Sequence, residues 1–415
     1  MGNIYKNSYI TVAPIATKSC WDGFLQYRNE HVNSRRRRVA QIRSTVKSHP
    51  VSSSIFYLLE RLGDTTSLCS IRKDDDPGLW SRRGWTFQEY QLSPRASGFS
   101  QHYLYFDCRD GEQTEKGEIR NSRETARALF KIGGSDSKPS LGYIDEYSEW
   151  YQIISTMYSS RHFTKQSDRL PALTGFGKEW ESMINKGEKS DRYVAGLWEK
   201  DMPRGLLWRP QSERSRPLDY ASPSWSWASI IGEVYWPWDM GEVRQGPGHK
   251  EASKIFQQFG ASELHYHFTL ERVDIPETDP YSLVTSGSIT VSAFLREMRL
   301  NPPSPNHDQG SLEFLDRNGS QNYDNPMQVV LENSLSIISL DVPSEFATAR
   351  NVWCFLVASR EVSGNSSRMN YAGLLLVSMN GNTNCFKRFG YFELVCKDKD
   401  RKIFDYMEIG EIVII

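Results

Sequence analysis

The side chains best suited to chemistry lie in one short stretch, residues 78–95, which read GLWSRRGWTFQEYQLSPR. Its one carboxylate, Glu89, follows the aromatic residue Trp85, with Arg83 and Arg95 nearby in the sequence. A carboxylate whose charge is held by an arginine could take part in acid–base or ribose-binding chemistry, so Glu89 is the candidate catalytic residue. The alternative is structural, with Glu89 pairing with an arginine or capping backbone amides to fix the turn. The sequence favours this structural role.

Few other groups in the chain are candidates for chemistry. Asp168 and Arg169 adjoin in the sequence and could form a buried ion pair, with the same ambiguity between a structural and a chemical role. His265 and His267 are separated by one residue, so on a strand they would lie on the same face and could both bind one metal ion. Two histidines without a third ligand are usually ordinary strand residues, so we predict no metal site. The chain carries no P-loop, HExxH, GxSxG or EF-hand pattern.

Several elements must position these groups. Weak alternation of apolar residues over 4–13 predicts a buried strand, and a second strand is expected at 103–108. Between 143 and 158, aromatic and aliphatic residues recur at helical spacing, which predicts a helix with one apolar face. Tryptophans and prolines are mixed between 198 and 238, which favours irregular chain packed between two domains.

The character of the chain changes after about residue 240. Short runs rich in β-branched and aromatic residues predict strands at 289–295, 328–332, 335–340, 352–359, 371–377, 386–395 and 411–415. Turn residues separate these runs, which is typical of an antiparallel sandwich or barrel-like domain.

Composition excludes several classes of protein. The 415 residues carry a formal net charge of −1, which gives no overall nucleic-acid footprint. No apolar run approaches the ~18 residues of a membrane span, and no secretory signal is recognisable in the first thirty residues. The six cysteines are dispersed without a CxxC pair, as is usual for reduced thiols inside cells. We therefore expect a cytoplasmic globular protein without a nucleic-acid partner or a membrane span.

The stretch around Glu89 resembles the third conserved block of the heterokaryon incompatibility (HET) domain of filamentous fungi. That block has the form R-(G/A)-W-T-x-Q-E-x-x-L-S-P-R. The residues that carry the match are Arg83, Gly84, Trp85, Thr86, Gln88, Glu89, Leu92, Ser93, Pro94 and Arg95. The match is long and ordered, and is far more specific than a lone glycine motif.

Further segments are similar to large proteins of this family, in the same order along the chain. They are residues 4–13, 103–108, 167–173, 195–198, 203–208 and 223–229, and their distinctive members are Asp168, Trp198, Trp208, Trp225 and Trp227. The resemblance covers most of residues 1–235. The family's first two blocks precede the segment at 4–13, so the resemblance implies a chain that lacks the N-terminal part of the HET domain. An incomplete gene model and a naturally truncated relative both stay open as explanations.

The resemblance also implies a fold. HET domains have a distant similarity to TIR domains, which implies a partial α/β domain with a TIR- or flavodoxin-like core and flanking helices. With the β-rich region that follows, the expected fold class is α+β overall. We predict three parts: residues 1–185 as the C-terminal part of the HET domain with a helical extension, 186–240 as a bridging segment rich in Trp and Pro, and 241–415 as the β-rich domain.

The function that the resemblance implies is non-self recognition, in which the HET domain triggers growth arrest or programmed cell death through a protein partner. Two alternatives stay open. One is a truncated, non-catalytic binding or decoy remnant. The other is a TIR-like death effector that consumes NAD, which would then be a substrate; no cofactor is expected.

Overall fold

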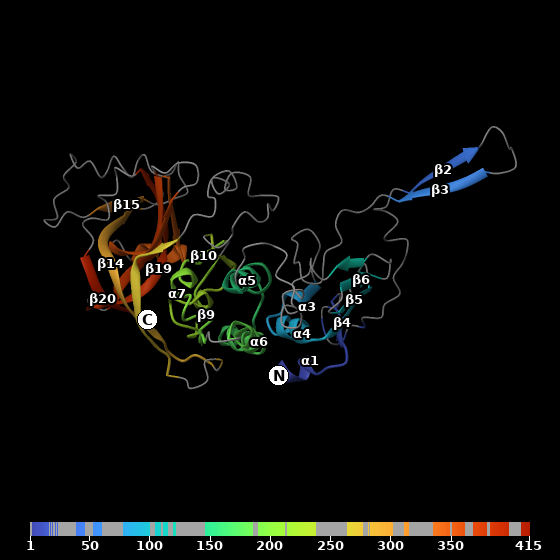
Figure 1. Cartoon of the computed structure of the whole chain (residues 1–415), viewed down its shortest axis with the longest axis horizontal. Helices are drawn as coiled ribbons and strands as arrows, with labels where there is room; N and C mark the ends of the chain where they lie inside the picture. The colour runs from blue at the N-terminus through green and yellow to red at the C-terminus, as the bar shows by residue number, and fades with distance from the viewer. Residues whose placement is uncertain are drawn as a thin grey trace. The chain divides into compact units, whose positions relative to one another are not determined.

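The computed structural model describes residues 2–15, 17, 19, 21, 23, 39–45, 53–59, 78–99, 104–108, 111–114, 119–121, 146–185, 190–211, 214–237, 264–276, 281, 283–301, 311–314, 335–348, 351–361, 368–379, 382–397 and 408–415. The chain divides into two compact units, Met1–Lys138 and Pro139–Ile415, which we name unit 1 and unit 2 (Figure 1). The strand predicted at 328–332 lies outside the described residues.

Unit 1 begins differently from the prediction. In place of one buried strand over 4–13, the structure has a short helix, α1 (Gly2–Lys6), followed by a three-residue strand, β1 (Thr11–Ala13). The alternation of apolar residues in this segment is too weak to distinguish the period of a strand from that of a helix. No residue of α1 is buried, and within β1 only Ala13 is buried, so the expectation of a buried strand was wrong.

The rest of unit 1 contains short helices and strands. Its elements are β2 (Val39–Thr45), β3 (Ser53–Leu59), α3 (Gly78–Arg82), α4 (Thr86–Leu92), β4 (Arg95–Phe99), β5 (Leu104–Cys108), β6 (Gly111–Thr114) and β7 (Ile119–Asn121). The strand predicted at 103–108 is confirmed as β5. Five strands form a sheet of order β1-β4-β5-β6-β7, in which β1 and β4 are parallel and the other neighbours are antiparallel. Strands β2 and β3 pair with each other, antiparallel, as a separate two-stranded sheet.

Unit 2 begins with a helical part. Its elements are α5 (Glu146–Ile153), the π-helical turn η3 (Ile154–Tyr158), the 3₁₀ turns η4 (Gln166–Asp168) and η5 (Pro171–Leu173), and α6 (Thr174–Ile184). The helix predicted between 143 and 158 is therefore present, with its last turn widened. Trp150, Tyr151, Ile154 and Tyr158 are all buried, as the apolar spacing predicted.

The segment rich in Trp and Pro is irregular, as predicted. It holds only short elements: β8 (Tyr193–Val194), β9 (Leu197–Trp198), α7 (Met202–Gly205), β10 (Arg209–Pro210), η6 (Trp227–Ser229) and β11 (Val234–Tyr235). Within unit 2, Figure 1 shows α7, β9 and β10 between the sheet on one side and α5 and α6 on the other.

The C-terminal part is rich in strands. They are β12 (His265–Tyr266), β13 (Phe268–Asp274), β14 (Ser288–Asn301), β15 (Ser311–Phe314), β16 (Leu335–Leu340), β17 (Asn351–Glu361), β18 (Arg368–Met379), β19 (Asn382–Lys397) and β20 (Glu408–Ile414), with a 3₁₀ turn, η7 (Pro343–Thr348), after β16. Pairing runs from β14 through β17, β18, β19 and β20 back to β14, so the sheet closes on itself. The sequence had left sandwich and barrel-like arrangements open.

This sheet is buried on both faces. One face carries a cluster made of Met298, Leu300, Val352, Cys354, Leu356, Met369, Tyr371, Leu375, Phe389, Phe392 and Leu394. Neighbouring positions along the same strands, such as Phe355, Leu374 and Phe386, point to the other face and are also buried. The second face includes the charged residue Arg388, which is fully buried.

The chain thus has an α+β fold with a large sheet, as expected at that coarse level. Residues 139–185 belong to unit 2 with the β-rich region, whereas the sequence had grouped them with the first 138 residues. The boundaries near 185 and 240 stay predictions. The TIR- or flavodoxin-like core also stays a prediction, because β1–β4 is the one parallel pair among the described strands of unit 1.

Candidate functional site

The block around Glu89 folds as two short helices and a strand. Thr86 Oγ1 donates hydrogen bonds to the carbonyl oxygens of Trp80 and Arg83, at 2.6 and 2.7 Å. The Trp80 carbonyl also accepts a hydrogen bond from the backbone N–H of Arg83, at 3.2 Å, so Thr86 adds a side-chain bond at the end of α3. The turn at Gly84 therefore joins α3 to α4 through the side chain of the first residue of α4.

Ser93 ends α4 and connects it to β1. Its Oγ donates to the carbonyl oxygen of Glu89 at 2.5 Å and lies 2.5 Å from Thr11 Oγ1. Pro94 follows and has no backbone N–H with which to continue the helix. The Ser-Pro pair of the motif therefore has a structural role, since it stops α4 and directs the chain into β4.

Glu89 lies half-buried on α4 and is hydrogen-bonded to Tyr5 of α1. Burial, followed by the charge of Glu89 and this hydrogen bond, raises the pKa of Tyr5 above its ordinary value. A phenol that stays protonated is a hydrogen-bond donor to the carboxylate over the whole neutral range. The structure thus brings Glu89 together with a residue that the sequence did not associate with it.

The arginine at the end of the motif contacts Tyr9. Arg95 donates from Nη1 to the carbonyl oxygen of Tyr9 at 3.4 Å, and its guanidinium lies 5.0 Å from the centre of the Tyr9 ring. Within the described residues no hydrogen bond or ion pair joins Arg95 to Glu89. Arg83 is exposed, whereas Gln88 and Leu92 of the motif are buried and Trp85 is half-buried.

The structure also adds polar groups that the sequence reasoning missed. Tyr90 donates a hydrogen bond to Asp107 of β5, and both residues are buried. Gln91 is buried as well, and neither atom of its amide has a hydrogen-bond partner in the part of the chain that is described. The one available signal was that Tyr90 and Gln91 adjoin Glu89 within the same motif. Nothing in the sequence pointed to Asp107 as a partner.

The other motif residues lie in unit 2 and serve packing. Seven tryptophans are fully buried there: Trp150, Trp180, Trp198, Trp208, Trp225, Trp227 and Trp236. The indole N–H groups of Trp150 and Trp227 both donate to the carbonyl oxygen of Gly196 at 3.1 Å, and that of Trp208 donates to the Trp225 carbonyl at 3.0 Å. Each of these bonds satisfies a buried donor and fixes an irregular turn.

The turn at Ala195 and Gly196 depends on these contacts. Both residues have positive φ, 46° and 93°. A Cβ on Gly196 would lie 2.5 Å from Nε1 of Trp227, so the indole excludes any side chain. Ser226, which precedes Trp227 in the chain, also holds this turn. Its Oγ donates a hydrogen bond to the Ala195 carbonyl oxygen at 2.7 Å. The separate motifs at 195–198 and 223–229 are therefore parts of one packed structure.

Asp168 and Arg169 do not form the buried pair that the sequence suggested. Arg169 is 1% exposed and donates from Nη2 to the carbonyl oxygens of Ser159 and Gly232, at 2.8 and 2.9 Å. Its guanidinium lies 5.3 Å from the centre of the Trp227 ring. Burial lowers the pKa of Arg169 to about 10. The arginine is stabilised by carbonyl dipoles and an aromatic face, while Asp168 is half-exposed.

A second buried arginine joins the sheet to the segment rich in Trp. Arg388 Nε lies 3.1 Å from Asp341 Oδ2, and both side chains are fully buried. Arg388 also donates to the carbonyl oxygens of Leu206 and Trp208, at 2.6 and 2.5 Å. Its guanidinium lies 3.5 Å from the centre of the Trp208 ring. Burial lowers the pKa of Arg388 to about 10, against the opposing effect of Asp341.

The predicted residues thus form two sets, one in each unit. Glu89, Ser93 and Arg95 belong to unit 1, and Asp168 and the motif tryptophans belong to unit 2. In the set of unit 1, the carboxylate of Glu89 is in contact with the phenol of Tyr5. Such a carboxylate is suited to hydrogen bonding and proton transfer. The set in unit 2 is a scaffold of aromatic rings and backbone hydrogen bonds.

The described residues contain no group of three His, Cys, Asp or Glu side chains placed to hold a metal ion. His267 Nε2 lies 2.7 Å from Ser359 Oγ, and burial followed by the charge of His265 lowers the pKa of His267. Among the described helices, none is long and apolar enough to cross a membrane.

Comparison with known proteins gives no relative. No protein-family model matches the chain, and no curated protein or solved structure matches it significantly. The class that fold and site define is therefore an α+β protein with a motif-bearing first unit and a tryptophan-rich second unit.

Proposed function

We propose that the chain is a heterokaryon incompatibility protein of a filamentous fungus, which acts in the cytoplasm and triggers growth arrest or programmed cell death. The observation that carries the proposal is the block 83–95, whose ordered residues resemble the third HET block and which folds around Glu89. A TIR-like core and a protein partner in incompatibility signalling are parts of the same proposal.

In this proposal Glu89 is the group that acts, and the tryptophan scaffold of unit 2 supports the fold. Glu89 is half-buried and hydrogen-bonded to Tyr5, so it is held in place and still reachable from solvent. A positioned carboxylate of this kind can accept a proton or a hydrogen bond from a partner or a substrate. Thr86 and Ser93 keep α4, and with it Glu89, in a fixed orientation.

The test is inducible expression of the full chain in a filamentous fungus. We expect growth arrest and uptake of a vital dye within hours of induction. The matched control is Arg272→Gln, which changes an exposed residue paired with Asp274 in unit 2 and should leave the arrest intact. Cellular NAD is measured in the same cultures, and a fall that precedes death would assign the NAD-consuming form of the effector.

Normal growth at a confirmed level of folded protein would contradict the proposal. The chain would then be a binding or decoy protein without death activity. A flat NAD level during arrest would exclude NAD consumption while leaving the effector function in place.

A further inference from the structure

Strand β12 covers a stretch of the β17 edge that lies beyond β14. Residues Asn351–Phe355 of β17 pair with β14. Beyond them, β12 pairs with β17 at two positions, His265 with Ser359 and Tyr266 with Ala358. Strand β18 pairs with β17 along both stretches, so it occupies the opposite edge. The ladder of β12 is only two residues long, and such short pairings open at a lower free-energy cost than long ones.

His267 fixes the end of this short ladder. Its backbone N–H donates to the Val357 carbonyl oxygen at 2.9 Å, and its Nε2 lies 2.7 Å from Ser359 Oγ. Ser359 is 2% exposed, so the imidazole is held against a buried group. The next residue, Phe268, begins β13 and packs against Phe355, with ring centroids 5.2 Å apart. Because β13 pairs with β14, His267 is the point at which the chain leaves the edge of β17.

A protonated imidazole has no negative partner at this position. His265 lies two residues before His267 and on the same face of the strand, while Tyr266 between them points to the other face. Within the described residues, no hydrogen bond or ion pair joins either imidazole to a carboxylate. The adjoining stretches of β13 and β14, residues 268–270 and 291–295, carry no titratable side chain. Burial, followed by the charge of His265, lowers the pKa of His267 below its ordinary value of 6.5.

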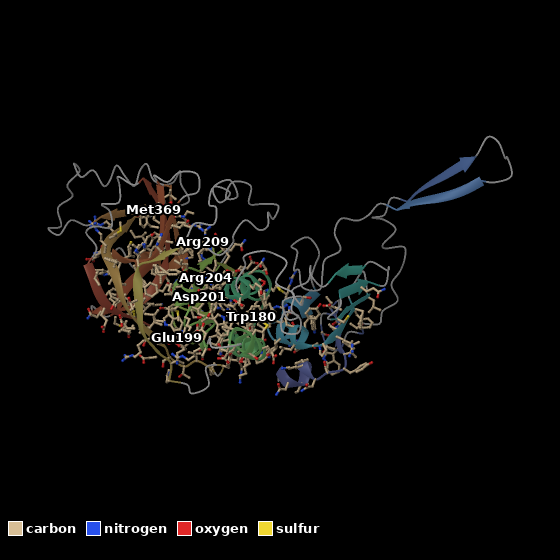
Figure 2. All side chains as sticks on the ribbon, viewed as in Figure 1. Trp180, Glu199, Asp201, Arg204, Arg209 and Met369 are labelled. Carbon is tan, nitrogen blue, oxygen red and sulfur yellow. The ribbon has the colours of Figure 1, made fainter. Side chains whose placement is uncertain are left out.

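The remaining titratable groups near the two histidines come from β17 and β18. Tyr371 lies opposite Ser359, and Glu361 follows Ser359 by two residues on the same face. Arg360, between them in β17, points to the other face. Glu361 is exposed, and its neighbour on β18 is Met369, which is labelled in Figure 2. An exposed carboxylate is screened by water, so Glu361 does not replace the missing partner.

We propose that β12 is an acid-released cover of the β17 edge and that His267 is the group that responds to pH. In the released strand water solvates the charge of His267, so this state takes up a proton more readily than the paired state. Pairing is therefore fully favoured above pH 6.5 and weakens as the pH falls below it. Release frees the backbone groups of Val357–Ser359, and an open strand edge can pair with another chain. The device lies in unit 2 and does not depend on the function proposed for Glu89 in unit 1.

The experiment is hydrogen–deuterium exchange of the wild-type chain at pH 5.5 and pH 7.5. Exchange is expressed as protection factors, which removes the intrinsic effect of pH on amide exchange. The protection of the His267 amide should fall several-fold, and by about tenfold at most, because pH 5.5 is one unit below 6.5. The internal control is β16, a strand of the same sheet that pairs only with β19 among the described strands and carries no histidine. Its protection should stay constant.

Two glutamine variants test whether His267 is the responding group. His267→Gln keeps a side chain that can form a hydrogen bond with Ser359 but cannot take up a proton, so the protection of β12 should be equal at the two pH values. His162→Gln is the matched control, because it removes an exposed histidine of unit 2 outside β12. The fall in protection should persist in this variant.

Three results would overturn the proposal. Constant protection of β12 in the wild type would show that acid does not release it. An equal fall in β12 and β16 would show that acid opens the whole sheet. Both results concern the wild-type chain, so they decide the matter even if His267→Gln does not fold. In a folded His267→Gln, a fall equal to that of the wild type would assign the response to another group.

Discussion

The described parts of the two units differ in how they bury tryptophans, and each also exposes apolar side chains, such as Leu218 and Ile409 in unit 2. Unit 2 encloses seven tryptophans completely, and several of their indole N–H groups are satisfied by backbone carbonyls. Unit 1 leaves Ile4, Tyr9 and Val12 exposed, with 70%, 81% and 49% of their surface accessible. Strand β1, which carries Val12, is at one end of the described sheet.

The difference indicates which interactions stabilise unit 2 and which surface of unit 1 is available for contacts. The irregular segment of unit 2 is held by buried polar groups, above all Arg388 and Arg169, which bind carbonyls that no helix or strand satisfies. In unit 1, the motif residues are joined by short-range bonds of Thr86 and Ser93, and apolar surface remains in contact with water. The free energy of unfolding of unit 2 should therefore be sensitive to the loss of single polar groups. In unit 1, changes of the surface should instead affect association with other chains.

The largest expected effect is that of Arg388→Ala. It leaves the buried charge of Asp341 with only the longer contact to Arg216 Nη2, at 3.7 Å, and removes the donors to the carbonyls of Leu206 and Trp208. Removing one partner of a buried ion pair typically costs about 3–5 kcal/mol. Urea unfolding followed by tryptophan fluorescence measures the loss for unit 2. Arg272→Ala, at an exposed pair, should change the free energy of unfolding by less than about 0.5 kcal/mol. An equal loss of unfolding free energy in the two variants would show that burial does not make the Arg388 ion pair more important than an exposed one.

A smaller but still large effect is expected for Gly196→Ala. The added Cβ would lie 2.5 Å from Trp227 Nε1, at a φ of 93° that non-glycine residues rarely adopt. Strain of this kind costs about 1–3 kcal/mol. Gly410→Ala is the matched control in the same unit, because the nearest atom to its new Cβ, on Leu295, is 3.9 Å away. If both variants unfold at the same urea concentration, the turn at Ala195 and Gly196 is not constrained as described.

The pH dependence of unit 2 follows from its buried tyrosines. Burial is the main cause that raises the pKa of Tyr158 and of Tyr193 above the ordinary value of 10.0. In the unfolded chain these phenols ionise near pH 10, whereas in the folded chain they stay protonated to higher pH. Their contribution is therefore fully present below pH 10 and is lost as the pH rises above it, by about 1.4 kcal/mol per pH unit for each tyrosine.

Urea unfolding at pH 8, 10 and 10.5 measures this effect, and absorbance at 295 nm reports phenol ionisation. The double variant Tyr158→Phe, Tyr193→Phe should show a smaller loss above pH 10 than the wild type. An identical slope in both proteins would show that other groups cause the alkaline instability.

Local patterns in the sequence explain why some elements could be predicted. The helix over 143–158 was correct because Trp150, Tyr151 and Ile154 repeat at helical spacing and are all buried. The strands from β16 to β20 were found because β-branched and aromatic residues gather in runs bounded by turn residues. The segment at 4–13 was wrong because a five-residue helix and a three-residue strand are too short to show a period.

The candidate site was predicted only in part. Glu89 could be selected from its motif, but its partner Tyr5 is distant in the sequence and belongs to the misassigned segment. Arg388 and Asp341 gave no signal, since single charged residues are usually exposed.

In unit 1, Val12→Lys should leave the fold nearly unchanged. Val12 is 49% exposed on β1, so the substitution should alter the free energy of unfolding by less than about 0.5 kcal/mol. The lysine should nevertheless reduce self-association, because a charge on an edge strand opposes pairing with another chain. Light scattering as a function of concentration measures this, with Thr269→Lys on an exposed position of β13 as the control. Unchanged association in Val12→Lys would show that this surface is not the one that self-associates.

The central claim, that the Glu89 block is the active part of an effector, is tested most directly by Glu89→Gln. This variant retains the size of the side chain and its ability to accept a hydrogen bond from Tyr5, so the thermal midpoint should change little. Induced growth arrest in a filamentous fungus is then compared among wild type, Glu89→Gln and Arg272→Gln at equal protein levels. The account predicts arrest with the wild type and Arg272→Gln, and normal growth with Glu89→Gln. Arrest by Glu89→Gln equal to that of the wild type would contradict it.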